Sequence, residues 1–195
     1  MKPQHLDQFA HTTADPWRWR AAQIADIQAM CNLLGPWAEQ ATHEFHEFNV
    51  VELSRNLAHL ILDQMYDPKR RLASVAVLTD SDEIVAVNLA TRDVRPMWSL
   101  DEQVIPLMLA VEPTLTSRIR VALTLQAMTM WERWAHVGKI PVINSGTIRE
   151  PMTAFMRLHE AMGYTVRGTA AFKRMNTVTF ELDAARPESA RIVLP

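Results

Sequence analysis

The spacing of apolar positions along this chain changes between two periods. In some stretches every second residue is apolar, which is typical of a strand with one buried face, and in others apolar residues recur every three or four positions, as in an amphipathic helix. These periods predict, in order, a strand at 17–20, helices at 22–34 and 51–65, strands at 72–79, 84–91 and 104–112, a helix at 117–136, a strand at 140–147, a helix at 151–162 and strands at 166–175 and 177–182. This order predicts an α+β fold in which helices flank a mostly antiparallel sheet.

Residues that favour turns and caps set the expected boundaries. Gly35-Pro36 is expected to end the first helix and Asp67-Pro68 the second. The tetrapeptide from Asp80 to Glu83 suits the turn of an antiparallel hairpin. Ser117 is a candidate cap for the long helix. Pro106 removes a donor from the strand at 104–112, which predicts a bulge or an edge position there.

The length and composition indicate one domain. With 195 residues, 48% of them hydrophobic, the chain can bury a single core of ordinary size. Residues 1–16 and 184–195 lack periodicity, so we expect an N-terminal arm, one domain at 17–183 and a C-terminal tail. The tail carries the apolar run Ile192-Val193-Leu194, which could dock on a partner.

Charge and cysteine content narrow the function classes. The net charge is −2 and the Lys and Arg residues are scattered, which argues against nucleic acid as a partner. Cys31 is the only cysteine and lies in an apolar helical run, so an intrachain disulfide is excluded and a reducing compartment is expected. No run approaches the roughly 18 apolar residues of a membrane span, and no signal peptide is evident. We therefore expect a soluble cytoplasmic protein without a membrane partner.

A histidine pair in the segment His43-Glu44-Phe45-His46-Glu47 suggests a metal site at first sight. Zinc-binding helices of the His-Glu-x-x-His type place their histidines four residues apart, whereas here they are three apart. A polar loop or helix face explains the segment better, and we expect no metal site.

Two motifs resemble those of the Gcn5-related N-acetyltransferases, and the order of elements over about 17–182 matches that family as well. Val111-Glu112-Pro113 is similar to the Val-x-Pro end of the family's fourth strand, and the run from Leu158 to Tyr164 is similar to its Leu-Tyr-x-x-x-Gly-Phe signature. The resemblance implies transfer of an acetyl or other acyl group from acetyl-CoA or another acyl-CoA to a small-molecule or protein amine. It implies also that the backbone of Leu109, Ala110 and Val111 pairs with the pantetheine arm and polarises the thioester carbonyl.

The glycines with which that family cradles the cofactor pyrophosphate are missing here, since no glycine occurs between Gly35 and Gly138. An alignment on the resemblance puts Arg118 at the first position of the family's loop, with Val121 and Leu123 where the glycines belong. Arg118, Arg120 and Val121 are then the candidate pyrophosphate-binding residues, with the arginines contacting phosphate directly. The alternative is that both arginines form the solvated face of a helix start.

The resemblance also suggests the proton-transfer groups. His159 stands where the family has a tyrosine that protonates the departing thiolate, and a histidine, with an unperturbed pKa near 6.5, can donate or accept a proton at neutral pH. Glu102 and Glu112 are the candidates for a general base, and Glu102 is the one we assign. The alternative for Glu102 is a solvated loop end, and for His159 a replacement in a site that no longer reacts.

A second function class therefore remains open from the sequence. The missing glycines, the histidine in place of tyrosine and the two terminal arms also suit a non-catalytic module of the same fold. Such a module would form a homo-oligomer or dock through its arms onto a larger assembly such as a virus particle, in which case its location would be the virion.

Overall fold

The computed structural model describes residues 15–43, 46–147 and 152–166. Nearly all of the predicted N-terminal arm, the final pair of strands and the C-terminal tail lie outside the described residues. The division into an arm, one domain and a tail stays a prediction.

The described elements follow the predicted order. They are β1 (Trp17–Ala21), a 3-10 turn η1 (Ile24–Asp26), α1 (Ile27–Thr42), α2 (Val50–Tyr66), β2 (Arg71–Leu78), β3 (Ile84–Val94), β4 (Gln103–Val111), α3 (Ser117–Gly138), β5 (Val142–Ile143) and α4 (Thr153–Ala161). The strands form one sheet in the order β1-β2-β3-β4-β5, antiparallel except for the last pair, which is parallel. The predicted α+β class with a mostly antiparallel sheet is confirmed.

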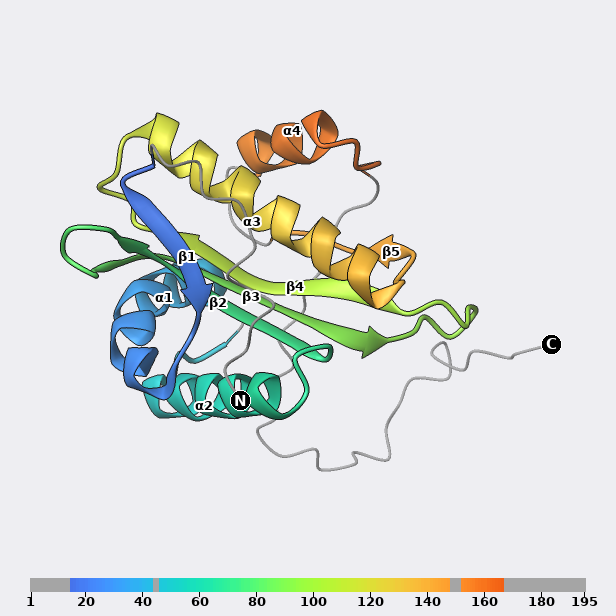
Figure 1. Cartoon of the computed structure of the whole chain (residues 1–195), viewed down its shortest axis with the longest axis horizontal. Helices are drawn as coiled ribbons and strands as arrows, with labels where there is room; N and C mark the ends of the chain where they lie inside the picture. Colours follow the sequence, from blue (N-terminus) through green and yellow to red (C-terminus); the bar gives the residue numbers. More distant parts are fainter. Residues whose placement is uncertain (1–14, 44–45, 148–151, 167–195) are drawn as a thin grey trace, which may run out of the picture.

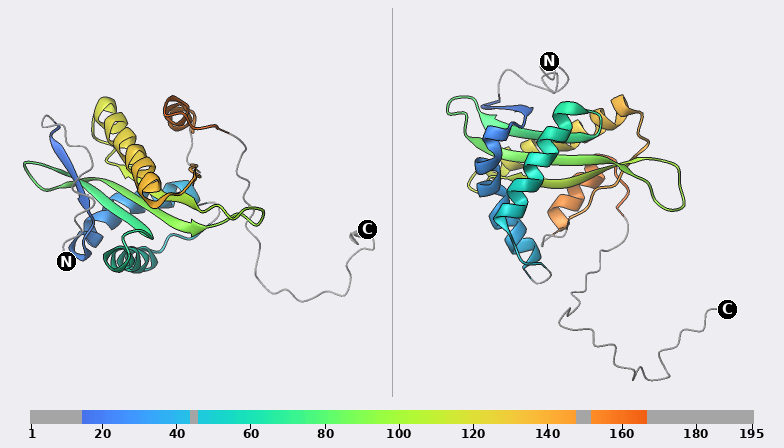
Figure 2. Two further views of the ribbon diagram at one scale, coloured as in Figure 1. Left: turned by 45° about the vertical axis from the view of Figure 1, so that its right-hand side comes forward. Right: turned by 90° about the horizontal axis from the view of Figure 1, so that it is seen from below.

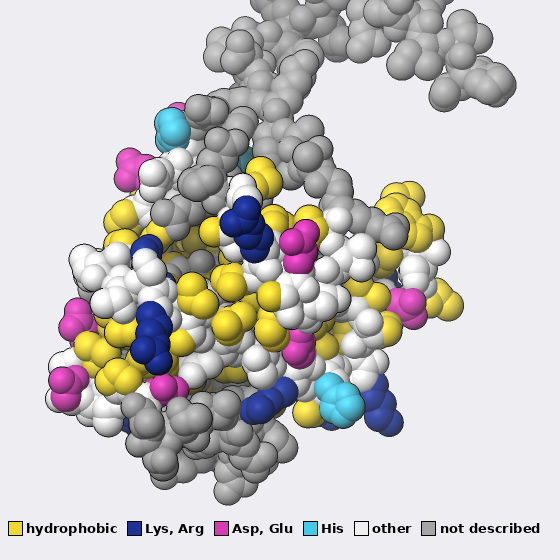
Figure 3. Space-filling model, turned by 90° about the horizontal axis from the view of Figure 1, so that it is seen from above, with side chains coloured by type: hydrophobic (Ala, Val, Ile, Leu, Met, Phe, Trp, Pro, Cys, Tyr) yellow, Lys and Arg dark blue, Asp and Glu magenta, His cyan; other side chains and the backbone are white. Residues whose placement is uncertain are grey.

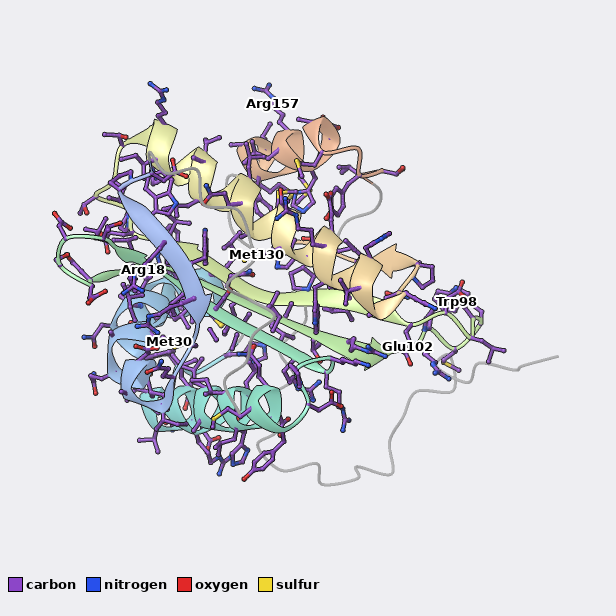
Figure 4. The ribbon with its side chains drawn as sticks, viewed as in Figure 1. Arg18, Met30, Trp98, Glu102, Met130 and Arg157 are labelled. Atoms are coloured by element: carbon purple, nitrogen blue, oxygen red, sulfur yellow. The ribbon has the colours of Figure 1, made fainter. Side chains whose placement is uncertain are left out.

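The sheet is the middle of three layers. Helices α1 and α2 cover one face, and α3 and α4 cover the other (Figures 1 and 2). Met30 of α1 and Met130 of α3 point toward the sheet from opposite sides (Figure 4). Successive side chains of a strand point to opposite faces, and nearly all side chains of β2 and of residues 85–90 of β3 are buried and apolar, so both faces of the sheet centre belong to the core.

The Trp-Arg-Trp-Arg strand at the sheet edge shows how one local pattern is used. The indole nitrogens of Trp17 and Trp19 both donate to Oε1 of Gln126 on α3, at 2.9 Å. Arg20, on the opposite face, pairs with Asp26 of η1. The strand thereby ties both helical layers to the sheet.

The first helix does not end at Gly35-Pro36, as the sequence predicted, but continues to Thr42. Pro36 lacks one backbone donor, yet Trp37 packs against the core beneath this helix, and this burial favours continuation. Gly35 lies close to the side chain of Phe48, since a Cβ added at residue 35 would be 3.2 Å from the phenyl ring. The dipeptide marks a close contact rather than a stop.

Two other boundaries also differ from the prediction. Thr116, not Ser117, caps α3 through its hydroxyl, which accepts from the Ile119 amide at 3.4 Å. The strand predicted at 140–147 is reduced to Val142–Ile143, because the Ile140 amide donates to the Ala135 carbonyl and so belongs to the end of α3. Ile140 therefore serves packing at the end of α3, and pairing with β4 is left to Val142 and Ile143.

Two expectations concern a membrane span and a metal site, and the described residues bear on both. No helix among them combines the length and the apolar character that crossing a bilayer requires. Within the same ranges, no three His, Cys, Asp or Glu side chains come together in a way that could hold a metal ion.

Candidate functional site

Strand β4 contains a bulge at the proline that the sequence singled out. Leu89 of β3 is opposite Met108, whereas Ala90 is opposite Pro106, so Leu107 is an extra residue without a partner on β3. The bulge predicted from Pro106 is confirmed. A bulge reverses which residues of a strand face each neighbour, and the two halves of β4 therefore differ in the direction of their backbone groups.

Beyond the bulge, no described strand pairs with the edge of β4 that faces away from β3, and this stretch is called the free edge. Among the described residues, β5 pairs with Gln103 and Val104, and just after β5 the Asn144 amide donates to the Val104 carbonyl at 2.9 Å. On the other side, the Glu112 amide donates to the Val85 carbonyl of β3. Because an antiparallel ladder alternates, the Ala110 backbone also faces β3, while the N–H and C=O groups of Leu109 and Val111 face the edge that β5 has left.

The free edge leads directly to the N-terminus of α3. Glu112 shapes the connection, since its carboxylate accepts from the amide and the hydroxyl of Thr114, at 3.2 and 2.8 Å. The backbone N–H groups of Thr116, Ser117 and Arg118 have no hydrogen-bond partner within the described part of the chain. Free amides at a helix N-terminus favour an anion, through hydrogen bonding and through the helix dipole.

The four side chains that the sequence placed near a pyrophosphate occupy different surroundings. Arg118 is exposed and has no ion-pair or hydrogen-bond partner among the described residues. Arg120 donates to the Ser117 hydroxyl at 3.3 Å. Val121 is 42% exposed, and Leu123 is completely buried on the side of α3 that packs against the core. Both aliphatic residues lie beyond the first helical turn, so the free amides are those of residues 116–118 and not those of the two positions aligned with glycines.

His159 is buried, and both of its ring nitrogens are engaged. It lies on α4 with 2% of its surface exposed, and its ring packs edge to face against Phe155 and Tyr164, with ring centroids 4.4 and 5.0 Å away. Nδ1 is 2.9 Å from the Phe155 carbonyl, and Nε2 is 2.8 Å from Oγ of Ser145. A carbonyl only accepts, so Nδ1 carries a hydrogen, and in the neutral ring Nε2 accepts from the Ser145 hydroxyl.

The partner Ser145 was missed by the sequence reading. It is half-buried and directly follows Asn144, whose amide donates to the Val104 carbonyl, so it lies just beyond the described pairing of β4 with β5. Its hydroxyl and His159 are 14 residues apart in the sequence. No local motif connects them, because they meet only when α4 packs against the segment that follows β5.

Tyr164 is the tyrosine adjacent to His159, but it is a poor substitute for the family's proton donor. Burial, with a smaller contribution from the charge of Glu132, raises the pKa of Tyr164 to about 12. Its hydroxyl has no hydrogen-bond partner within the described ranges. At neutral pH this hydroxyl holds its proton firmly and packs beside the histidine ring.

Glu102 is held away from the free edge by two arginines. Its carboxylate oxygens are 2.9 Å from Arg95 and 3.1 Å from Arg92. The hydrogen bond from Arg95, with the positive charge of both arginines, holds the pKa of Glu102 below its ordinary value. Glu102 lies beside the loop that carries Trp98 (Figure 4). It precedes the first residue of β4, roughly 23 Å along the strand from Leu109 at about 3.3 Å per residue, and its ion pairs suit a structural role.

The candidate site therefore consists of a backbone edge with an anion-binding end and a Ser–His pair. The edge comprises Leu109 and Val111, and the anion-binding end is the start of α3. The pair of Ser145 and His159 lies at the opposite end, where β5 leaves the sheet. On the face that carries α3 and α4, hydrophobic side chains gather in the middle, and the Lys and Arg side chains are scattered among them (Figure 3).

Comparisons with known proteins agree on the architecture. No protein-family model matches the chain, and no curated protein matches its sequence. Among solved structures, glucosamine-6-phosphate N-acetyltransferase from Arabidopsis thaliana matches with a TM-score of 0.62 at 12% identity, over 83% of this chain and 100% of that one. The aminoglycoside 6'-N-acetyltransferase AAC(6')-Ih from Acinetobacter baumannii matches with a TM-score of 0.60 at 15% identity, over 82% and 98% of the chains.

A structure of a third enzyme was determined with coenzyme A. This aminoglycoside N-acetyltransferase, AAC(6')-Iy, matches with a TM-score of 0.59 at 13% identity, over 82% of this chain and 95% of that one. At such low identity the likeness concerns the fold. Together with the bulged β4 and its separation from β5, it identifies the architecture of this chain as the Gcn5-related N-acetyltransferase fold.

Proposed function

We propose that this protein transfers an acyl group from an acyl-CoA, with acetyl-CoA as the simplest donor, to the amine of a small molecule or protein. The observation that carries the proposal is the free edge of β4. Leu109 and Val111 direct their backbone groups to a side where no described strand pairs, immediately before a helix N-terminus whose first three amides have no partner in the described part of the chain.

Each part of this arrangement suits one part of the donor. An extended amide-containing arm can pair with the N–H and C=O groups of Leu109 and Val111 as an added strand does. The pyrophosphate then lies at the amides of Thr116, Ser117 and Arg118, with the exposed Arg118 guanidinium beside it. The arm runs from that point along the edge toward Ser145, which brings the thioester to the end of the site where the Ser–His pair lies.

The same arrangement explains how the pyrophosphate loop can lack glycine. Glycines allow close approach where backbone amides must reach a phosphate from within a tight loop. Here the free amides precede the two aliphatic positions, and Leu123 points into the core. The bulky residues at the aligned glycine positions therefore leave the start of α3 open to a phosphate.

Calorimetric titration with acetyl-CoA tests the proposal. We expect saturable binding to the wild-type protein and binding about 10 to 100 times weaker for Arg118→Ala, because a charge-assisted hydrogen bond contributes about 1.5 to 3 kcal/mol. Arg133→Ala is the matched control, since Arg133 is an exposed arginine on the same helix but about four turns later. Its affinity should equal that of the wild type.

The competing function is a non-catalytic module of this fold. It predicts no heat of binding for acetyl-CoA or coenzyme A at any accessible concentration, and no difference between the two arginine variants. The missing glycines favour that class, and the titration separates the two directly.

A further inference from the structure

We infer that Ser145 and His159 form a proton relay, in which the Ser145 hydroxyl contacts the reacting groups and His159 stores the proton. The inference rests on the proposed acyl transfer and assigns the proton acceptor of that reaction. It replaces Glu102 in this role and changes the role of His159 from direct proton donor to the buried partner of a serine.

Two hydrogen bonds of the His159 ring support the relay. The Phe155 carbonyl fixes the hydrogen on Nδ1 of His159 at 2.9 Å, which leaves the lone pair of Nε2 directed at Oγ of Ser145, 2.8 Å away. A hydroxyl, a base and a third group that orients the base form the arrangement by which proteins activate a serine. Edge-to-face packing against Phe155 and Tyr164 keeps the ring in this orientation.

Ser145 is more accessible than His159. His159 is 2% exposed and cannot itself reach a substrate, whereas Ser145 is half-buried and stands on the exposed segment that follows β5. Next to it, a Cβ added to Gly146 would meet no atom within 4 Å among the described residues. The serine is therefore the member of the pair that borders open space.

Ser145 also has a suitable position relative to the free edge of β4. The Asn144 amide, next to Ser145, donates to the Val104 carbonyl near the start of β4. From there to Leu109 the strand covers roughly 16 Å. A donor arm that pairs with Val111 and Leu109 and continues along this edge approaches Ser145 with its thioester end.

Every proton that leaves the amine returns to the departing thiolate through Ser145 and His159. The amine nitrogen attacks the thioester carbon, a C–N bond forms, and the nitrogen loses a proton to Oγ of Ser145 while the serine's own proton moves to Nε2 of His159. When the C–S bond breaks, the same path runs in reverse, and Ser145 delivers the proton to the departing thiolate as His159 returns one to Oγ. The products are an amide and a free thiol, and the pair ends as it began.

The test compares variants in the full-length protein, with acetyl-CoA as donor and hydroxylamine as a small amine acceptor, by following thiol release. Ser145→Ala and His159→Gln should each lower kcat by about 100-fold or more, with little change in the affinity for acetyl-CoA measured by calorimetry. Glutamine can still accept the serine's hydrogen bond but cannot take its proton, so His159→Gln preserves packing and removes chemistry. Ser145→Thr, which keeps a hydroxyl, should recover much of the rate.

Two controls and one isotope measurement separate chemistry from structure. Ser81→Ala in the β2–β3 turn and His136→Gln in the last turn of α3 should retain the wild-type rate. The wild-type rate should fall in heavy water, and Ser145→Ala should lose this solvent isotope effect.

Each remaining outcome counts against the relay. Absence of acetyl-CoA binding removes the proposed function and the relay with it. Binding without any rate above the uncatalysed reaction would count against both transfer to this acceptor and the relay, whereas a His159→Gln variant with the wild-type kcat would overturn the relay alone. An acetyl group found on Ser145 by mass spectrometry would make the serine a nucleophile and would also overturn the relay.

Discussion

Two arginine–aspartate pairs show how burial decides the value of an ion pair in this molecule. Arg20 makes two hydrogen bonds to the Asp26 carboxylate, at 2.6 and 2.8 Å, and the side chains are 22% and 10% exposed. Arg18 and Asp82 are 2.7 Å apart, but their side chains are 46% and 70% exposed. Water screens the second pair far more effectively than the first.

Replacing the two aspartates should therefore have unequal effects. Asp26→Asn leaves a largely buried guanidinium without its counter-ion, and we expect a loss of about 2 to 4 kcal/mol in the free energy of unfolding. Asp82→Asn should cost less than about 1 kcal/mol, and asparagine tolerates the positive φ of 56° at that position. Urea unfolding at neutral pH measures both, and equal losses would contradict this assignment.

The Arg20–Asp26 pair predicts that the free energy of unfolding depends on pH. Burial works to raise the pKa of Asp26, but hydrogen bonds from Arg20 and from the Gln23 amide outweigh it, and the pKa lies below its ordinary value. A carboxyl with a depressed pKa stabilises the fold above its unfolded value of about 3.9, and this contribution is lost as the pH falls through the lower folded value. The stability of Asp26→Asn should accordingly decline less than that of the wild type when the pH falls below about 4.

At the scale of single residues, the sequence identified His159 but not its partner. Its position in the run from Leu158 to Tyr164 was readable because the motif is local. Ser145 carried no signal, since a serine in Asn-Ser-Gly is typical of any loop, and its role depends on the packing of α4. Glu102 illustrates the reverse, because its two arginine partners were not evident from its place before a strand.

At the scale of the element, strand β4 determines the site. Without the bulge, a period of two would put Val104 on the opposite face of the sheet from Leu109 and Val111. With Leu107 as an extra residue, Val104 contributes to the core beneath α3 together with them. The bulge therefore lets Val104, at the start of β4, and Leu109 and Val111, near its end, face the same layer of the core.

Deleting Leu107 tests this role. The deletion forces either Val104 or the pair of Leu109 and Val111 onto the wrong face, and we expect a loss of more than about 2 kcal/mol in the free energy of unfolding. The matched change is Leu107→Ala, which keeps the bulge and removes a side chain that is 47% exposed, at a cost of about 1 kcal/mol or less. A deletion variant as stable as Leu107→Ala in urea would show that the register is not fixed here.

The element boundaries that the sequence predicted wrongly share one physical cause. Gly35-Pro36 is a stop signal by local preference, but the burial of Trp37 against the core carries α1 onward. Ile140 lies in an apolar run that suits a strand, yet its amide completes the end of α3. In both cases tertiary packing, which a single sequence does not display, outweighs a local preference. The bulge at Pro106 was predictable because a missing backbone donor has a local effect.

At the scale of the whole molecule, the layers and the sheet order follow from the sequence pattern, whereas the function rests on one gap in the sheet. The order of strands and helices and the match to solved acetyltransferases agree on the fold. What the fold offers chemically is the place where β4 and β5 part, with amide donors at one end and the Ser–His pair at the other.

Hydrogen exchange by NMR, with and without acetyl-CoA, tests this claim most directly. If the donor arm pairs with the free edge, the amides of Leu109 and Val111 should exchange markedly more slowly in the presence of acetyl-CoA. The Ala110 amide between them already faces β3 and should change little. Slower exchange at residues 109 and 111 but not at 110 is the predicted result. Unchanged exchange at both, at a concentration that saturates the protein, would contradict the account.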